Sequence, residues 1–258
     1  MKFDQAREAL AGIPYIRPRA GRILYQFILD AGVADILELG FAHGTSTCYM
    51  AAALDERGSG SILTIDRPAA RDLEPSIETL LERTGLSPFV DAVYAPVSYT
   101  WELMKIIQAH TVDGRCQPQF DFCFIDGAHT WEADGLAFFL VDKLLKPGGW
   151  VLFDDLGWCM SDDPRLLAYP STRALPREVR DTPQVARIFE LLVSQHPDYT
   201  EVRVDEGLGR AWGWARKKGS DQVSSGAVEV HKRLRGLQRR RAALLLGWRG
   251  ARSILRRH

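Results

Sequence analysis

Three aspartates stand where two buried strands are predicted to end. Asp126 follows the apolar run FDFCFI, and Asp154 and Asp155 follow the run WVLF. In an open α/β sheet, ligands bind beyond the carboxyl ends of the strands, so residues at these ends come together. Carboxylate oxygens are the ligands that a hard cation such as Mg²⁺ prefers. The three aspartates are therefore predicted to hold one divalent cation.

A glycine-bearing turn predicts a second site at the same edge of the sheet. In the segment ELGFAHGTS, Glu38 ends an apolar run, Gly40 and Gly44 follow, and Ser46 offers a hydroxyl at the start of a helix. Glycine permits a tight turn and close approach of a ligand to the backbone, and a helix N-terminus presents unpaired N–H groups. The dinucleotide fingerprint G-x-G-x-x-G does not fit, because alanine and threonine occupy its second and third glycine positions.

The run from Glu38 to Gly44 resembles the first motif of the class I S-adenosylmethionine (SAM)-dependent methyltransferases, with Ala42 in place of the middle glycine. The resemblance implies that Glu38 lies near the amino-acid end of SAM and that the two glycines shape the turn beneath it. Asp66, which ends the next strand, matches the ribose-binding acid of the family; a carboxylate there can accept two hydrogen bonds. Ser98, at the end of YAPVS, is the expected adenine contact, with a helix cap as its alternative role.

The segment from 121 to 155 resembles the metal-dependent O-methyltransferases of macrolide sugars and, more distantly, of catechols. The matching residues are IDGAH (125–129), KPGG (146–149) and FDD (153–155). The resemblance implies that Asp126, Asp154 and Asp155 hold Mg²⁺ and that His129 is the general base, with a helix cap or a contact to a ligand carboxylate as the alternative for His129. Catechol enzymes have Asp-Asn at the second acidic site, so the Asp-Asp pair favours the sugar-modifying branch.

These residue types suit methyl transfer to a hydroxyl. A bound cation lowers the pKa of a coordinated oxygen, and a general base contributes about 10²–10⁴-fold. The expected activity is SAM-dependent, magnesium-assisted O-methylation of a sugar, glycoconjugate or oligosaccharide, with a polyketide or catechol-type acceptor as the alternative. A nucleic-acid methyltransferase is the next alternative, but the Asn/Asp-Pro-Pro-Tyr motif of base methylation does not follow the fourth predicted strand. A non-catalytic scaffold is a further alternative, and the three aspartates argue against it.

The elements around these motifs alternate between strand and helix. Helices are predicted at 3–12, 18–31, 44–55, 72–84, 99–110, 130–145 and 182–195. Strands are predicted at 34–39, 61–66, 88–95, 120–126, 149–155, 200–205 and 209–215. This order predicts an α/β, Rossmann-like, doubly wound fold with a mainly parallel seven-stranded sheet and an antiparallel terminal hairpin.

Residues 1–216 are predicted to form the methyltransferase domain, in which 1–31 are an N-terminal helical cap and 156–181 an acceptor lid. Long loops at strand ends are often functional. Candidate acceptor contacts, each more often structural or exposed than functional, are Trp158, Asp162, Asp163 and Tyr169 in the lid and Tyr15 and Arg17 in the N-terminal loop.

A net charge of zero hides a basic C-terminal tail, residues 217–258. The tail holds 12 of the 33 basic and 2 of the 33 acidic residues, which leaves 21 basic and 31 acidic residues in the body. The tail is predicted to form an amphipathic helix, because mostly apolar residues recur every seven positions in two rows. One row is 223, 230, 237, 244 and 251, and the other is 227, 234, 241, 248 and 255, with arginine at 241. Several roles of the tail remain open. It could pack on the body or on a second subunit, bind an anionic membrane surface, contact nucleic acid or be disordered. A basic helix alone is weak evidence for nucleic acid.

The composition indicates a cytoplasmic protein, with membrane association only through the tail. The N-terminus MKFDQAREAL is charged and unlike a secretory signal, and no apolar run reaches membrane-spanning length. The four cysteines, Cys48, Cys116, Cys123 and Cys159, lack paired metal spacing and are expected to be reduced.

Overall fold

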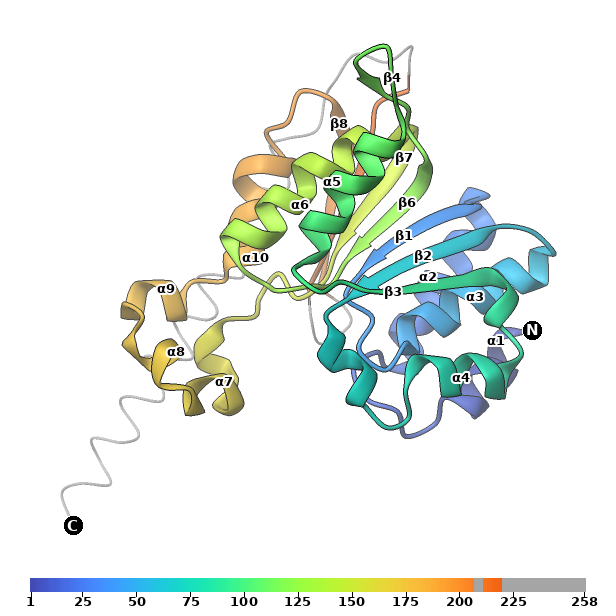
Figure 1. Cartoon of the computed structure of the whole chain (residues 1–258), viewed down its shortest axis with the longest axis horizontal. Coiled ribbons are helices and arrows are strands. Elements are labelled where there is room, and N and C mark those ends of the chain that lie inside the picture. The colour runs from blue at the N-terminus through green and yellow to red at the C-terminus, as the bar shows by residue number, and fades with distance from the viewer. Residues whose placement is uncertain (207–210, 220–258) are drawn as a thin grey trace.

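The computed structural model describes residues 1–206 and 211–219. Its centre is a seven-stranded sheet in the order β3-β2-β1-β6-β7-β9-β8 (Figure 1). The strands are β1 (Asp35–Leu39), β2 (Ser61–Asp66), β3 (Val90–Tyr94), β6 (Phe120–Ile125), β7 (Leu145–Phe153), β8 (Tyr199–Asp205) and β9 (Trp212–Lys217). The first five are parallel, and β9 pairs antiparallel with both β7 and β8. The predicted Rossmann-like sheet with an antiparallel terminal pair is confirmed.

The winding direction of the chain reverses between β1 and β6. β1 pairs with β2 on one side and with β6 on the other, and such a reversal opens a crevice beyond the strand ends. The register places Leu39 opposite Ile125, and Ile125 opposite Phe153. The residues that follow these three strands therefore emerge side by side at one edge.

Helices cover both faces of the sheet (Figure 1). One face carries α1 (Phe3–Ala9), α2 (Pro18–Ala31), α3 (Thr45–Arg57) and α4 (Ile77–Thr84), and the other carries α5 (Tyr99–Ala109), α6 (Trp131–Leu144), α10 (Gln184–Ile188) and the π-turn η4 (Phe189–Val193). Strand residues alternate between the two cores: Phe122 and Phe124 of β6 pack in the first, and Cys123 and Ile125 in the second. The parallel strands are thus buried on both sides, as their apolar sequences predict.

Some segments differ from the predicted elements. The helix predicted at 72–84 begins at Ile77, because Pro75 interrupts it and the Ser76 hydroxyl caps the later start by accepting a hydrogen bond from Thr79 N at 3.3 Å. Short helices and a small hairpin were not predicted. They are η1 (Pro68–Asp72), η2 (Ser87–Phe89), η3 (Met160–Asp162), α7 (Pro164–Ala168), α8 (Pro170–Ala174), α9 (Arg177–Asp181), β4 (Thr111–Val112) and β5 (Arg115–Cys116).

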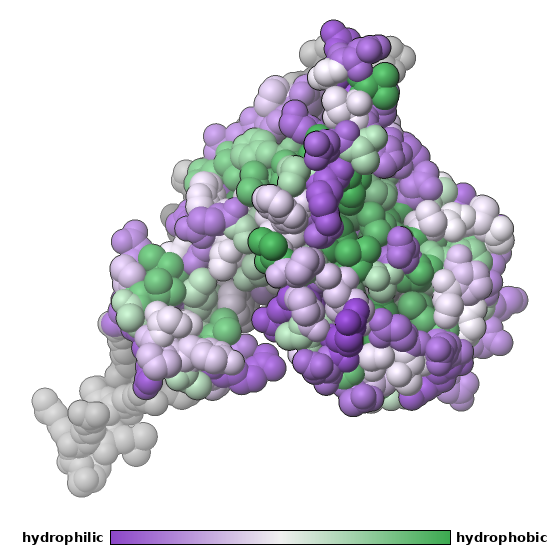
Figure 2. Space-filling model, in the orientation of Figure 1, coloured by the Kyte–Doolittle hydropathy of each residue, from purple (hydrophilic) through white to green (hydrophobic). Residues whose placement is uncertain are grey.

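The segment predicted to be an acceptor lid consists of short helices without buried residues. Residues 160–181 form η3, α7, α8 and α9, and none of these elements contains a buried residue. In Figure 1 the lid helices stand apart from the sheet. Figure 2 shows apolar surface on the lid and over α5 and α6.

The predicted helix of the basic tail lies outside the described residues. Strand β9 ends at Lys217, so the sheet includes the first residue of the predicted tail. Within 1–206 and 211–219, none of the helices combines the length and apolar character that crossing a bilayer requires.

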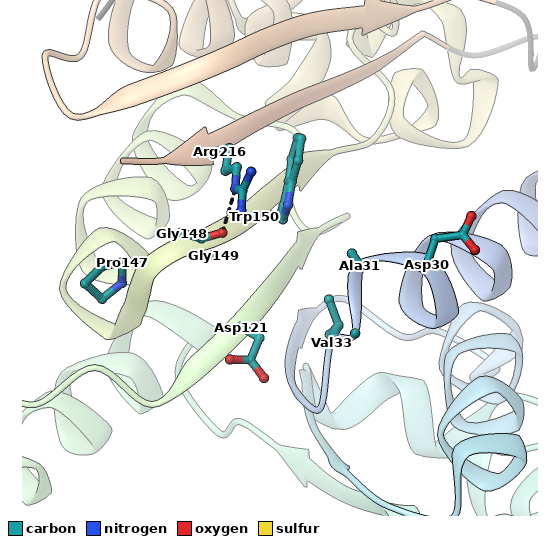
Figure 3. Close-up of a pocket in the computed structure, with 10 residues that line it drawn as sticks. Asp30, Ala31, Val33, Asp121, Pro147, Gly148, Gly149, Trp150 and Arg216 are labelled. Carbon is teal, nitrogen blue, oxygen red and sulfur yellow. Dashed lines mark hydrogen bonds between the residues drawn. The ribbon is translucent and has the colours of Figure 1, made fainter. Parts of the chain in front are cut away.

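A cavity of about 540 Å³ lies at the amino ends of the strands (Figure 3). It is lined by Asp121 near the start of β6, Trp150 in β7, Arg216 near the end of the antiparallel β9, and the C-terminal end of α2. Arg216 Nε donates to the carbonyl oxygen of Gly148 at 2.9 Å. This cavity is at the edge opposite to the motifs at the carboxyl ends of β1, β2, β6 and β7.

Candidate functional site

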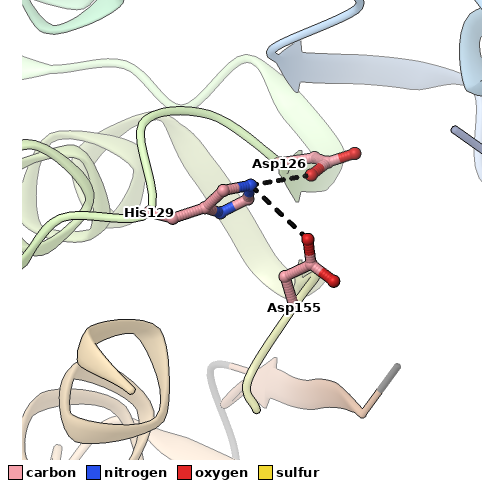
Figure 4. Close-up of side chains that lie close together, drawn as sticks. All are labelled: Asp126, His129 and Asp155. Atoms are coloured by element: carbon pink, nitrogen blue, oxygen red, sulfur yellow. Dashed lines mark ion pairs between the residues drawn. The ribbon is translucent and has the colours of Figure 1, made fainter. Parts of the chain in front are cut away.

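Two carboxylates and an imidazole converge at the carboxyl ends of β6 and β7 (Figure 4). His129 Nε2 lies 3.6 Å from Asp126 Oδ1 and 3.7 Å from Asp155 Oδ2. One ligand atom from each of the three residues lies within 4.8 Å of the others. Asp155 is buried, and Asp126 and His129 are half-buried. The arrangement can hold a divalent cation, or pair a protonated imidazole with two carboxylates.

The backbone at this site adopts unusual conformations. His129 has φ of 55° and Asp155 has φ of 54°, which is the left-handed region that residues other than glycine rarely adopt. Such conformations cost about 1–3 kcal/mol each and gather at functional sites. Asp126 follows β6 directly, and its N–H donates to the Leu39 carbonyl oxygen at 2.9 Å. The sheet therefore fixes Asp126. The left-handed backbone conformations of His129 and Asp155 direct their side chains toward Asp126.

Asp154 differs from the prediction that it shares the metal with Asp126 and Asp155. It is 1% exposed, and its Oδ1 accepts hydrogen bonds from Trp212 Nε1 at 2.7 Å and from Asp155 N at 2.6 Å. Both aspartates lie beyond the end of β7, and the left-handed backbone at Asp155 directs its carboxylate toward the site while Asp154 bonds Trp212. His129 takes the third position in the observed group.

The loop that carries His129 is held by two residues that the sequence analysis missed. Ala128 N donates to the Tyr99 hydroxyl at 3.3 Å, and that hydroxyl donates to the buried Asp134. Burial raises the pKa of Asp134, and burial together with the Asp134 charge raises the pKa of Tyr99. A side chain at Gly127 would come within 2.8 Å of the Tyr99 ring. The available signal was Asp134 itself, a carboxylate on the apolar face of α6 with Phe138 and Val141.

The predicted cofactor turn is shaped by glycines and held by Asp66. Gly40 has φ of 92° and Gly44, the N-cap of α3, has φ of 87°. Asp66 Oδ2 accepts hydrogen bonds from Phe41 N at 2.9 Å and from Ala42 N at 2.7 Å. Asp66 thus orders the backbone of the turn, and ribose contact by the same carboxylate stays a prediction.

Gly40→Ala is expected to destabilise the protein more than Gly58→Ala. Both glycines have positive φ, 92° and 74°, so an alanine at either site pays a backbone strain of about 1–3 kcal/mol. Only at Gly40 would the added methyl group overlap the carbonyl oxygen of Asp126; at Gly58 nothing lies within 4 Å. Urea unfolding of the two variants measures the difference. Equal losses would show that the close approach of the turn to β6 is unimportant.

Glu38 and Ser46 are bonded to each other inside the protein. Glu38 is fully buried, and its carboxylate accepts hydrogen bonds from Ser46 Oγ at 2.5 Å, Thr47 Oγ1 at 2.5 Å and Thr64 Oγ1 at 2.6 Å. Burial raises the pKa of Glu38 to about 7 against the opposing effect of these three donors. The structure therefore places Glu38 beneath the turn, where it joins β1, β2 and α3. Direct contact of Glu38 or Ser46 with a cofactor stays a prediction.

The raised pKa of Glu38 predicts a loss of stability as the pH rises. Between the ordinary pKa of 4.5 and the folded pKa of about 7, the folded state keeps a proton that the unfolded state releases. This proton stabilises the fold fully below pH 4.5, and the effect is lost as the pH rises through about 7. The full change is about 3 kcal/mol. Urea unfolding from pH 5 to 8 should show the wild type losing stability relative to Glu38→Gln. The exposed Glu82→Gln is the control, and parallel curves for wild type and Glu38→Gln would contradict the prediction.

The predicted adenine contact and lid residues occupy separate places. Ser98 is the N-cap of α5, and its Oγ accepts a hydrogen bond from Trp101 N at 3.1 Å, which was its alternative role. The Trp158 ring lies 5.2 Å from the ring of His129, so it forms a wall of the site. In the N-terminal loop, the Tyr15 ring packs 5.7 Å from the His43 ring, and Arg17 is the exposed N-cap residue of α2. In the predicted lid, Asp162 Oδ2 accepts a hydrogen bond from Cys159 N, and Asp163 caps α7 and forms an ion pair with Arg165. The Tyr169 side chain is 61% exposed.

Known structures share this fold. The O-methyltransferase of Bacillus cereus in complex with S-adenosylhomocysteine (SAH) is 21% identical with a TM-score of 0.59, and the match covers 84% of this chain and 92% of that one. TomG from Streptomyces achromogenes, an O-methyltransferase of tomaymycin synthesis in complex with SAM, is 20% identical with a TM-score of 0.57, covering 84% and 89%. The SAH-bound methyltransferase PaMTH1 of Podospora anserina is 16% identical with a TM-score of 0.57, covering 83% and 86%.

Sequence comparison adds a family match to the shared fold. None of the curated proteins matches the chain significantly. Residues 37–156 match the family model described as a methyltransferase domain. The matched segment contains the glycine turn, Asp66 and the group of Asp126, His129 and Asp155. Residues 37–156 are therefore similar to a methyltransferase domain.

Proposed function

We propose that the protein is a SAM-dependent O-methyltransferase in which Mg²⁺ assists transfer to a hydroxyl of a sugar, glycoconjugate or oligosaccharide. The observation that carries the proposal is the group of Asp126, His129 and Asp155 beside the glycine turn. It combines ligands for a hard cation with a base, which are the two functions that activate a hydroxyl.

The glycine turn fits the donor of the methyl group. SAM supplies an electrophilic methyl on a sulfonium. Gly40 and Gly44 bring bare backbone to the strand end, and the N-terminus of α3 follows directly. Each carboxylate oxygen of Asp66 has two lone pairs, so Asp66 can accept ribose hydroxyls while it holds the turn. The solved structures with SAM or SAH support this choice of donor through their shared fold.

The chemistry of the donor set fits Mg²⁺ as well. Asp126 and Asp155 would be its protein ligands, because Mg²⁺ is usually held by one or two carboxylates and keeps further positions for water and substrate oxygens. When bound, the cation stabilises negative charge on an acceptor oxygen. His129 Nε2 is better suited to a different task, because imidazole is not a preferred ligand of Mg²⁺.

His129 is assigned the proton transfer. Its Nε2 lies within 3.7 Å of both carboxylates, so the imidazolium formed by taking the acceptor proton is stabilised in place. The loop anchored by Tyr99 and Asp134 fixes the ring, and Trp158 closes one side of it. A flat aromatic wall beside the base suits the apolar face of a sugar ring, which supports the saccharide acceptor.

A small aromatic or polyketide-type acceptor is the second candidate. It is favoured by the likeness to TomG, an O-methyltransferase involved in tomaymycin synthesis. The same wall formed by Trp158 can stack on an aromatic ring.

A methyl-donor assay tests the proposal. Purified full-length protein is incubated with SAM and a panel of sugars, oligosaccharides, polyketides and catechols, with and without Mg²⁺, and SAH formation is measured. Magnesium-dependent SAH formation with a saccharide is the expected result. Turnover with catechols alone would select the second acceptor class, and binding of SAM without turnover on any hydroxyl would reject O-methylation of these classes.

A further inference from the structure

Helices α5 and α6 share an apolar outer surface that the proposed reaction does not use. Trp101 and Met104 of α5 are 51% and 36% exposed, and Leu136 and Phe139 of α6 are 50% and 47% exposed. The two helices pack against each other, and apolar surface covers them in Figure 2. We name these four residues the α5–α6 face. A contiguous apolar surface of this kind marks an interaction site.

The chain leaves the sheet beside one end of this face. Lys217, the last residue of β9, donates through Nζ to the carbonyl oxygen of Asp142 and lies 3.2 Å from Asp142 Oδ1. Asp142 is in the last turn of α6, so Phe139 and Leu136 lie one and two turns back along the same helix. At 1.5 Å per residue, the distance from Asp142 to Leu136 is about 9 Å along the axis. Gly219, the last described residue, therefore lies only two residues beyond this contact with α6.

The residues beyond this point have the pattern needed to cover it. Residues 220–258 lie outside the described chain, but their sequence carries apolar residues spaced by four, three, four and three, namely Val223, Ala227, Val230, Leu234 and Leu237. This spacing gives a helix one apolar stripe. From 223 to 237 the stripe would be about 21 Å long, the length of the 14-residue α6.

Charge favours an acidic body, and not a second tail, as the partner of the tail. The tail from Lys217 onward has 12 basic and 2 acidic residues, whereas the body has 21 basic and 31 acidic residues. Two tails brought together would repel, while a tail and an acidic body attract. The body of the same chain is favoured because Lys217 contacts Asp142 at the end of α6. We propose that residues 220–258 dock on the α5–α6 face of their own chain through the apolar stripe from Val223 to Leu237.

Photo-crosslinking of the full chain tests this docking. p-Benzoylphenylalanine replaces Phe139, and a mixture of ¹⁴N- and ¹⁵N-labelled protein is irradiated and digested. Crosslinks between position 139 and residues 220–258 of the same isotope are expected. The same probe at Glu82, which is exposed on α4 on the other face of the sheet, is the control and should give no tail crosslinks. Crosslinks of mixed isotope would show that a second copy covers the face, and an absence of tail crosslinks at 139 would reject the docking.

Proteolysis gives an independent measurement. The double substitution Leu136→Glu and Phe139→Glu should speed tryptic cleavage after Lys232, Arg233 and Arg235 by about tenfold or more, because cleavage tracks the population of the open segment. Val179→Glu, an exposed apolar position on α9, should leave the rate unchanged. All of these side chains are exposed, and unchanged thermal unfolding confirms that the body is intact. Equal cleavage rates in the wild type and the double variant would overturn the proposal.

Discussion

Replacing Asp126 or Asp155 with alanine is expected to lower turnover by about 10³-fold, while SAM still binds. Each change removes one of the two carboxylates proposed to hold Mg²⁺. Stabilisation of a developing oxyanion by a metal contributes several kcal/mol, and each 1.36 kcal/mol is a factor of ten in rate. SAH formation at saturating SAM measures the loss, and calorimetric titration with SAM measures donor binding. A chelator should abolish wild-type turnover, and added Mg²⁺ should restore it.

Two further aspartates separate this effect from general damage. Asp91→Ala changes an exposed carboxylate of β3 and should leave turnover unchanged. Asp154→Ala removes the acceptor of the buried Trp212 and Asp155 hydrogen bonds, so it should lower the unfolding free energy by about 1–3 kcal/mol. Loss of turnover in the Asp126 and Asp155 variants together with full wild-type activity in chelator would show that the two carboxylates act on His129 and not on a metal.

His129→Ala is expected to reduce turnover by about 10²–10⁴-fold, the contribution of a positioned general base. The affinity for SAM should stay within about twofold, because His129 contacts the two carboxylates and Trp158, which are assigned to the metal and the acceptor. Single-turnover rates at saturating acceptor and Mg²⁺ measure the chemical step. His110→Ala, at the C-cap of α5, is the matched control.

The dependence of the rate on Mg²⁺ decides between the two roles of His129. As a base, its loss lowers the rate at every Mg²⁺ concentration. As a metal ligand, its loss raises the Mg²⁺ concentration needed for half-maximal rate, and excess Mg²⁺ restores turnover. Recovery of wild-type turnover in excess Mg²⁺ would therefore assign His129 to metal binding.

The sheet was predictable because its signals are local. Each parallel strand is a short apolar run followed by a turn or a polar residue, and both faces of these strands are buried, so the run itself reveals the strand. The glycines of the turn were visible for the same reason: φ values near 90° at Gly40 and Gly44 require that residue type. The lid gave no such signal. Its five-residue helices bury no side chain, so they have no apolar period to find.

The detailed membership of the site depends on contacts between distant parts of the chain. The sequence places two adjacent aspartates after β7 but does not show which one faces Asp126. Trp212, 58 residues away, bonds Asp154 and leaves Asp155 to the site. Tyr99 and Asp134 are 35 residues apart, and their support of the His129 loop appears only when α5 and α6 pack. Glu38 was visible as a motif residue, yet its three hydroxyl donors come from α3 and from β2.

The place of β9 between β7 and β8 has a consequence for synthesis of the protein on the ribosome. Among the strands of residues 1–206 and 211–219, β9 is made last, yet it lies inside the sheet, while the earlier β8 forms the edge. At about 5–20 residues per second, the nascent chain needs roughly 3–13 s to extend from the end of β7 to Lys217. Until then the newly made β7 exposes unpaired backbone groups, which is the kind of edge that recruits strands from other chains. Chaperones that shield emerging polypeptides would therefore matter most in this interval.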